Sequence, residues 1–183
     1  MNTITSEERF EFATFWSRVA AYLIDIILIG GFTALFNVIN VANFKSFILY
    51  FIIATIAILY KPLMETYYGA TFGKMTMKLK VTNFNFCSID LKQSLIRSLI
   101  FIIPSLLYFP IYYLAFKNPE LANANQIFIF SSGLLNEYPI QSWIGRLSFI
   151  LITIDVVFLL TDSTKERKSF HDRLAKTYVI FDL

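Results

Sequence analysis

The chain has 183 residues, of which 56% are hydrophobic and only 16% are charged, whereas an ordinary soluble domain carries about 25% charged residues. Its mean hydropathy is +0.59. This balance excludes a soluble globular protein, and the scarcity of Gly (6) and Pro (5) excludes collagen-like and low-complexity chains. The composition therefore predicts an all-α integral membrane protein, long enough for about four spans of about 20 residues each.

Two apolar segments in the first half of the chain are long enough to cross a bilayer. They run from about residue 16 to 36 and from about residue 47 to 63, close to the roughly 20 helical residues that a hydrocarbon core of about 30 Å requires. Arg18 lies at the start of the first segment and Asp25 lies inside it. Pro62 marks the predicted exit of the second segment, because proline ends or kinks a helix.

Two further spans are predicted in the second half, from about residue 95 to 116 and from about residue 143 to 161. Arg97 lies near the start of the third span. The fourth span carries Asp155 within it and Asp162 directly after it. The whole chain, residues 1–183, is therefore expected to form a single membrane domain.

The Lys and Arg residues fall unevenly on the two sides of this four-span arrangement. Cytoplasmic segments of membrane proteins carry the excess of such residues, so both termini and the 61–92 loop are predicted to be cytoplasmic. The net charge of +3 then reflects topology rather than nucleic-acid binding. The predicted cytoplasmic side carries twelve basic residues, Arg9, Arg18, Lys61, Lys74, Lys78, Lys80, Lys92, Lys165, Arg167, Lys168, Arg173 and Lys176, against three on the other side, Lys45, Lys117 and Arg146.

A short β element is predicted outside the bilayer. Residues 75–82 alternate apolar and polar side chains, the period of a half-buried strand. Residues 177–181 are β-branched and aromatic, and they could pair with that strand and cover its edge. The outer loop, residues 117–142, contains apolar runs too short to span, and the sequence does not decide between an interfacial and a re-entrant segment.

Four charged residues in or beside the apolar spans need an explanation. A carboxylate in the middle of an apolar helix costs about 2.5–3.5 kcal/mol on insertion scales, so both Asp25 and Asp155 should face the bundle interior. Arg18 and Arg97 could pair with these carboxylates or with Asp162 and Asp172. One interpretation is a proton or cation pathway, and the other is a buried ion-pair network that only fixes helix register.

Other chemical signals are weaker. His171 lies in a basic stretch that predicts a contact on the cytoplasmic surface rather than catalysis or metal binding. The 69–74 segment lacks the spacing of a phosphate loop, so Gly73 and Lys74 are interpreted as part of a turn, with Lys74 at the lipid headgroups. A single cysteine, Cys87, excludes an intrachain disulfide and a Cys-based zinc site. We therefore expect no cofactor and no enzymatic activity.

Three sequence segments resemble motifs of the RDD family of bacterial membrane proteins, which is named for an Arg and two Asp. They are RVAAYLID at 18–25, GATFGK at 69–74 and HDRLAKT at 171–177. The resemblance implies a multi-pass protein of the bacterial cytoplasmic (inner) membrane, with Arg18 and Asp25 as the family's Arg and first Asp. For the second Asp it favours Asp172, with Asp162 as the alternative.

Two functional hypotheses from different classes follow. The first, which draws on the resemblance, is a transport-type protein that exchanges a monovalent cation for protons, with Asp25 titrating and Arg18 as its tuning partner. The second is a non-transporting scaffold or accessory subunit that docks a membrane or cytoplasmic protein.

Several partners are expected besides the lipid bilayer. Lys78 and Lys80 are candidates for contact with anionic lipid headgroups. The small residues Gly30 and Gly31 are candidate contacts in a homo-oligomer. Nucleic acid is not an expected partner, because the basic residues flank apolar runs instead of forming one stripe.

Overall fold

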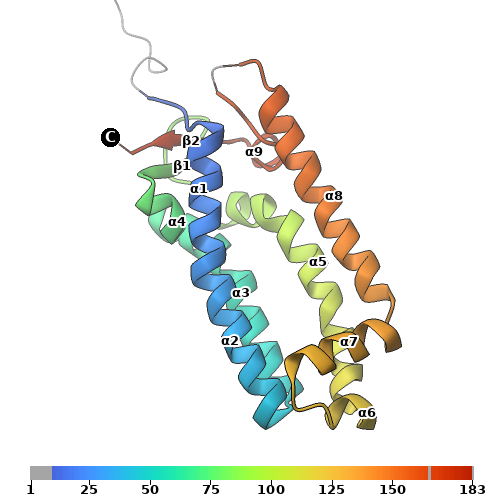
Figure 1. Ribbon diagram of the computed structural model, residues 1–183. Coiled ribbons are helices and arrows are strands. Elements are labelled where there is room, and N and C mark those ends of the chain that lie inside the picture. The colour runs from blue at the N-terminus through green and yellow to red at the C-terminus, as the bar shows by residue number, and fades with distance from the viewer. Residues whose placement is uncertain (1–9, 165, 183) are drawn as a thin grey trace, which may run out of the picture. The chain divides into compact units, whose positions relative to one another are not determined.

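The computed structural model describes residues 10–164 and 166–182 (Figure 1). Arg9 and Lys165, two of the predicted cytoplasmic residues, lie outside them. The described residues are mostly helical and confirm the predicted fold class. Four helices are long and apolar enough to cross a membrane, Phe15–Phe44, Phe47–Tyr68, Leu91–Lys117 and Ile140–Thr161.

The first of these helices is longer than predicted and consists of four consecutive helical pieces. It begins after Thr14, whose side chain accepts a hydrogen bond from the Ser17 amide and caps the first turn. A π-helical turn starts directly after Asp25, and the helix ends at residue 44 instead of 36. The pieces are α1 (Phe15–Asp25), η2 (Ile26–Gly30), α2 (Gly31–Ile39) and η3 (Asn40–Phe44).

The predicted exit of the second span at Pro62 is wrong, because α3 (Phe47–Tyr68) continues past the proline. The Pro62 carbonyl accepts hydrogen bonds from the side chains of Thr66, at 2.7 Å, and Ser94, at 2.9 Å. The bond from Ser94 attaches α3 to α5 (Leu91–Lys117) beside the proline. The extra helical turns place Glu65 inside the helix rather than in a loop.

The remaining spans and the outer loop are also helical. The structure has α5 at Leu91–Lys117 and α8 at Ile140–Thr161, each beginning a few residues earlier than predicted. The undecided outer loop contains the short helices α6 (Pro119–Ala122) and α7 (Ile127–Glu137). Neither is long enough to span a bilayer.

The β element is a two-stranded antiparallel sheet of β1 (Leu79–Asn83) and β2 (Thr177–Phe181), with Val81 opposite Val179. The bounds predicted for the second strand are confirmed. The first strand was predicted to start at Met75, and this is wrong, because the chain forms the helix α4 (Phe72–Thr76) first. The Thr71 hydroxyl accepts from the Lys74 amide and starts that helix.

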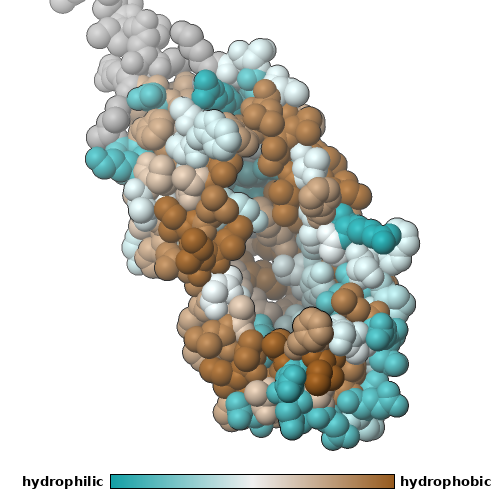
Figure 2. Space-filling view, in the orientation of Figure 1, coloured by the Kyte–Doolittle hydropathy of each residue, from teal (hydrophilic) through white to brown (hydrophobic). Residues whose placement is uncertain are grey.

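The chain divides into two compact units. The polar unit comprises the chain up to Ile26, Tyr60–Ser98 and the chain from Thr153 onward, and the apolar unit comprises Ile27–Leu59 and Leu99–Ile152. Each long helix contributes residues to both units. Large hydrophobic side chains remain exposed along these helices, and Figure 2 shows them as brown surface. Such exposure is expected where lipid is the solvent.

Each unit has its own core. In the polar unit, α9 (Phe170–Ala175) leads into β2, and the buried hydrophobic residues come mainly from α1 and the two strands: Ala13, Ala21, Leu79, Val81, Ile89 and Val179. In the apolar unit, the core consists of side chains from η3, α5, α6, α7, α8 and the link between α6 and α7: Val41, Ile111, Ala115, Leu121, Ala124, Phe130, Leu134 and Ile144. Tyr50 and Tyr112 stack there with ring centroids 3.9 Å apart.

The contact of α4 with α1 yields a first prediction. A Cβ on Gly73 would collide with the Ala21 carbonyl and lie 3.0 Å from the Asp25 carboxyl carbon. We therefore expect Gly73→Ala to lower the free energy of unfolding by about 1–3 kcal/mol, the usual cost of overpacking, measured by SDS titration in detergent micelles. Gly31→Ala is the control, because nothing lies within 4 Å of its added Cβ. Equal stability of the two variants would contradict this close packing.

Candidate functional site

The first carboxylate that the sequence singled out, Asp25, is held by three neutral donors. Tyr60 Oη donates to Oδ1 at 2.8 Å, Thr71 Oγ1 donates to Oδ2 at 2.6 Å, and the Gly73 amide donates to Oδ1 at 2.9 Å. Tyr60 Oη also accepts from the Phe72 amide at 2.9 Å. These bonds attach the start of α4 to the end of α1 and to α3, so Asp25 acts as an anchor between segments.

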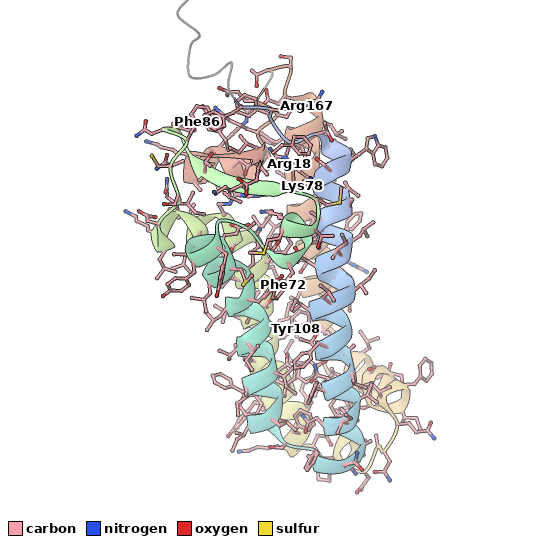
Figure 3. All side chains as sticks on the ribbon, turned by 90° about the vertical axis from the view of Figure 1, so that its left-hand side faces the viewer. Arg18, Phe72, Lys78, Phe86, Tyr108 and Arg167 are labelled. Carbon is pink, nitrogen blue, oxygen red and sulfur yellow. The ribbon has the colours of Figure 1, made fainter. Side chains whose placement is uncertain are left out.

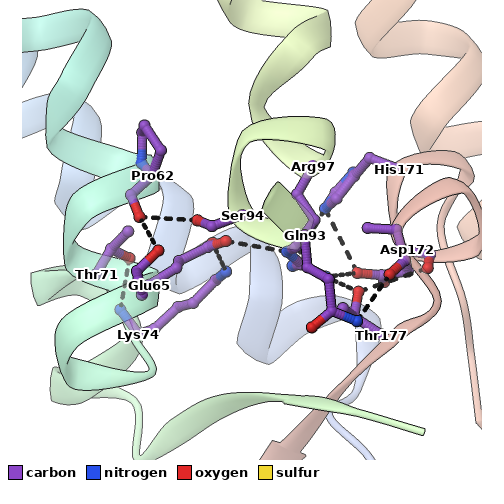
Figure 4. A network of polar contacts seen from close by, with 12 residues as sticks. Pro62, Glu65, Thr71, Lys74, Gln93, Ser94, Arg97, His171, Asp172 and Thr177 are labelled. Carbon is purple, nitrogen blue, oxygen red and sulfur yellow. Dashed lines mark hydrogen bonds and ion pairs between the residues drawn. The ribbon is translucent and has the colours of Figure 1, made fainter. Parts of the chain in front are cut away.

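A second set of charges forms a buried network around Arg97 (Figure 4). Arg97 Nε donates to Glu65 Oε2 at 2.9 Å, and Nη1 donates to Asp172 Oδ1 and to Thr177 Oγ1. Lys74 Nζ donates to the other Glu65 oxygen at 2.5 Å. The side chains of Arg97, Glu65 and Asp172 have no exposed surface.

Arg18 completes this network from α1. Its Nη1 donates to Asp172 Oδ2 at 2.5 Å, so the Asp172 carboxylate receives a guanidinium on each oxygen. Its Nη2 donates to the Arg167 carbonyl at 2.9 Å; Figure 3 labels both residues. Asp172 also makes a capping box with Ser169 at the start of α9. One carboxylate therefore joins α1, α5 and α9.

The electrostatics of the groups outside the spans follow from this arrangement. Burial alone would raise the pKa of Asp172, but the guanidiniums of Arg18 and Arg97 outweigh it and hold that pKa well below its usual value. Burial lowers the pKa of Lys74, and the Glu65 carboxylate opposes the shift. Asp172 is therefore ionised at any physiological pH, and the network keeps its charges.

The pair formed by His171 and Asp155 lies beside the network and is partly open to solvent, with side chains 12% and 14% exposed. His171 Nδ1 lies 2.7 Å from Asp155 Oδ1, and Nε2 lies 3.4 Å from Arg97 Nη2. These contacts fit a neutral ring that donates from Nδ1 and accepts at Nε2. The His171 amide also donates to Asp155, which attaches α9 to α8.

Burial lowers the pKa of His171, although the Asp172 charge and the Asp155 hydrogen bond oppose this. The charges of Lys61 and Arg97 add to the lowering. A proton on Nε2 would also point at the Arg97 guanidinium, so that two donors would face each other. In the neutral ring, Nε2 is instead an acceptor facing this donor. The neutral ring is therefore the form that the folded structure favours.

Asp162, the alternative for the second Asp, lies outside the Arg97 network. It accepts from the Thr164 amide and hydroxyl and from the Lys168 amide, and Arg173 lies 3.2 Å away. Burial would raise its pKa, but these hydrogen bonds and Arg173 lower it to about 2. Asp162 therefore organises the turn after α8, whereas Asp172 is the carboxylate that meets Arg18.

The predicted residues are thus all in the polar unit, and the structure decides between the pairings that the sequence left open. Arg18 binds Asp172 rather than Asp25, although it lies two helical turns from Asp25 on the same helix. Asp155 binds His171. The predicted surface positions of Lys74 and His171 are wrong: Lys74 points inward to Glu65, and His171 lies against Asp155 and Arg97.

Glu65 is the charged network residue that sequence reasoning missed. The predicted helix exit at Pro62 put Glu65 in a loop, where a carboxylate needs no explanation. Its position four residues after Lys61 is a spacing that places both on one helix face, and this was the available signal. Thr71 and Thr177 were missed because a threonine gives no charge signal. No cluster of three or more metal-binding side chains occurs among the described residues.

The spans and the network together define an α-helical multi-pass membrane protein whose polar unit is built on buried ion pairs. A comparison with family sequence profiles matches residues 12–176 to the RDD family. The chain therefore belongs to the RDD family. No curated protein and no solved structure matched the sequence.

The network predicts which charged residues stability depends on. Glu65→Gln removes the carboxylate that Lys74 binds and one of the two that Arg97 binds, so we expect it to cost about 3–5 kcal/mol of unfolding free energy. Asp182→Asn is the control, because its 3.7 Å pair with Lys80 is exposed and should be worth less than about 1 kcal/mol. SDS titration of both variants measures this, and costs of similar size would refute the assignment.

His171 predicts a pH dependence with a definite sign. Its pKa in the folded protein lies below the ordinary 6.5, so the unfolded chain takes up the proton first as pH falls. Stability should be full above about pH 6.5 and should decrease as pH falls toward the folded pKa. Thermal unfolding in detergent from about pH 8 to pH 5 measures this pH dependence. His171→Gln is the comparison variant, because glutamine does not titrate and the variant should lose the part of the pH dependence that His171 causes. Parallel profiles of the two proteins would contradict it.

Proposed function

We propose that this protein is a non-transporting membrane scaffold or accessory subunit, in which the Arg97 network holds the polar unit as a rigid platform for a membrane or cytoplasmic protein partner. The observation that carries the proposal is the complete burial of Arg97, Glu65 and Asp172, whose charges are all matched by ion pairs within the chain. Buried networks of this kind are best known for fixing one arrangement of segments.

The environment of Asp25 supports the same conclusion. An ion-carrying carboxylate must exchange its partner for a proton or a cation, whereas Asp25 is already satisfied by Tyr60, Thr71 and Gly73. Arg18, its expected tuning partner, is committed to Asp172. Removing Asp25 would therefore detach α4 rather than stop a transport step.

A second candidate, monovalent cation/proton exchange, rests on a different pair. Asp155 and His171 are partly exposed, and a histidine ring can take up and release a proton near neutral pH. If the protein transports protons, this pair is the better candidate for the titrating site than Asp25. Four spans are few for a transporter built on internal repeats, so this candidate also requires a homo-oligomer.

The location of the protein is part of the proposal. We place it in the bacterial inner membrane with both termini in the cytoplasm. Of the twelve basic residues that the sequence assigns to the cytoplasmic side, the ten that the structure describes all belong to the polar unit, and the apolar unit contains Lys45, Lys117 and Arg146. The exposed Gly31 on α2 is the candidate contact for a second copy.

A flux measurement distinguishes the two candidates. Purified protein in proteoliposomes carrying an internal pH dye is expected to show no proton flux on addition of Na⁺ or K⁺ beyond that of empty vesicles. Asp25→Asn should lower the folded yield instead. The scaffold proposal fails if the wild type shows cation-dependent flux that Asp155→Asn abolishes while the variant remains folded.

A further inference from the structure

The short helix α4 exposes apolar side chains and turns a charged one inward, the opposite of what is expected for a helix in water. Phe72 and Met75 are 49% and 39% exposed, whereas Lys74 points inward to Glu65. A helix surrounded by water buries its apolar face and exposes its charges. The outer face of α4 is therefore suited to lipid, and the exposed Tyr67 and Tyr68 at the end of α3 are typical of a membrane interface.

A surface pocket of ≈ 160 Å³ opens next to this lipid-facing helix. Its walls come from the end of α3, from α4 and the links on either side of it, from β1, and from the residue after β2: Tyr68, Ala70, Met75, Lys78, Leu79, Lys80 and Asp182. At about 30 Å³ per water molecule, it holds a group of a few heavy atoms rather than a whole lipid.

The charges of the pocket favour an anion. Lys78 and Lys80 contribute two ammonium groups, and Asp182 contributes the opposing carboxylate. The Asp182 carboxylate is 62% exposed and lies 3.7 Å from Lys80 Nζ, a weak pair that a stronger anion can replace. The Asp182 amide donates to the Lys78 carbonyl at 2.8 Å, which fixes this wall of the pocket.

We infer that this pocket binds the phosphate of an anionic phospholipid headgroup. The pocket combines two lysines with Tyr68 and Met75, which belong to the lipid-facing surface, so a phosphate attached to acyl chains fits it better than a free phosphate does. The lysines hold the phosphate, and the chains extend along the exposed face of α4. This inference is independent of whether the protein is a scaffold or an exchanger.

Titration of the full-length protein in detergent with fluorescent phosphatidylglycerol, and separately with fluorescent phosphatidylcholine, tests the inference. We expect preference for phosphatidylglycerol, a loss of about fivefold for Lys78→Gln or Lys80→Gln, and roughly 25-fold for both. Asp182→Asn should strengthen binding, a gain that a misfolded variant would not give. Lys92→Gln, an exposed lysine outside the pocket, is the matched control.

Three outcomes would overturn the inference. Equal affinity for the two lipids would show that no anion site exists. An equal loss in Lys92→Gln would show attraction to the general positive charge instead of binding in the pocket. Competition by inorganic phosphate as effective as that by unlabelled phosphatidylglycerol would assign the pocket to a free anion.

Discussion

The structure of the polar unit depends on one buried side chain, Arg97. A guanidinium with no exposed surface is tolerated only if carboxylates and hydroxyls satisfy it. Glu65 and Asp172 meet that requirement from α3 and α9, and Thr177 adds a hydroxyl at the start of β2. The position of Arg97 on α5 therefore determines where three other segments must lie.

The other polar contacts add further segments to this network. Glu65 also forms an ion pair with Lys74 of α4, and Asp172 forms one with Arg18 of α1. Asp25 then attaches α4 to α1 through neutral donors, which is why Gly73 must approach the Ala21 carbonyl so closely. The polar unit is thus a set of segments joined by matched charges, with a small hydrophobic core beneath the sheet. In lipid, where apolar side chains gain little by packing together, such polar contacts carry much of the specificity.

Sequence reasoning predicted the spans and the second strand because both depend on local hydrophobicity. It also recognised Arg18, Asp25, Arg97 and Asp155 as charges that need an explanation, and it offered Asp172 as one possible partner. It left Asp172 as one of several possible partners of Arg18 and could not choose it, because the two residues are 154 positions apart and no local period connects them. The treatment of Pro62 as a helix end concealed Glu65, and Lys74 was misplaced because its carboxylate partner was missing.

The central claim is that this network is closed to water, and a cysteine-accessibility measurement tests it most directly. Ser94 is buried and lies three residues before Arg97, on the same face of α5, so Ser94→Cys in a Cys87→Ser background places a thiol of similar size beside the network. The account predicts that a membrane-impermeant maleimide added to both sides of proteoliposomes leaves this thiol unlabelled until the protein is denatured, while the exposed Cys87 of the wild type reacts readily. Rapid labelling of the folded Ser94→Cys protein would reveal a water path to the Arg97 network and contradict the account.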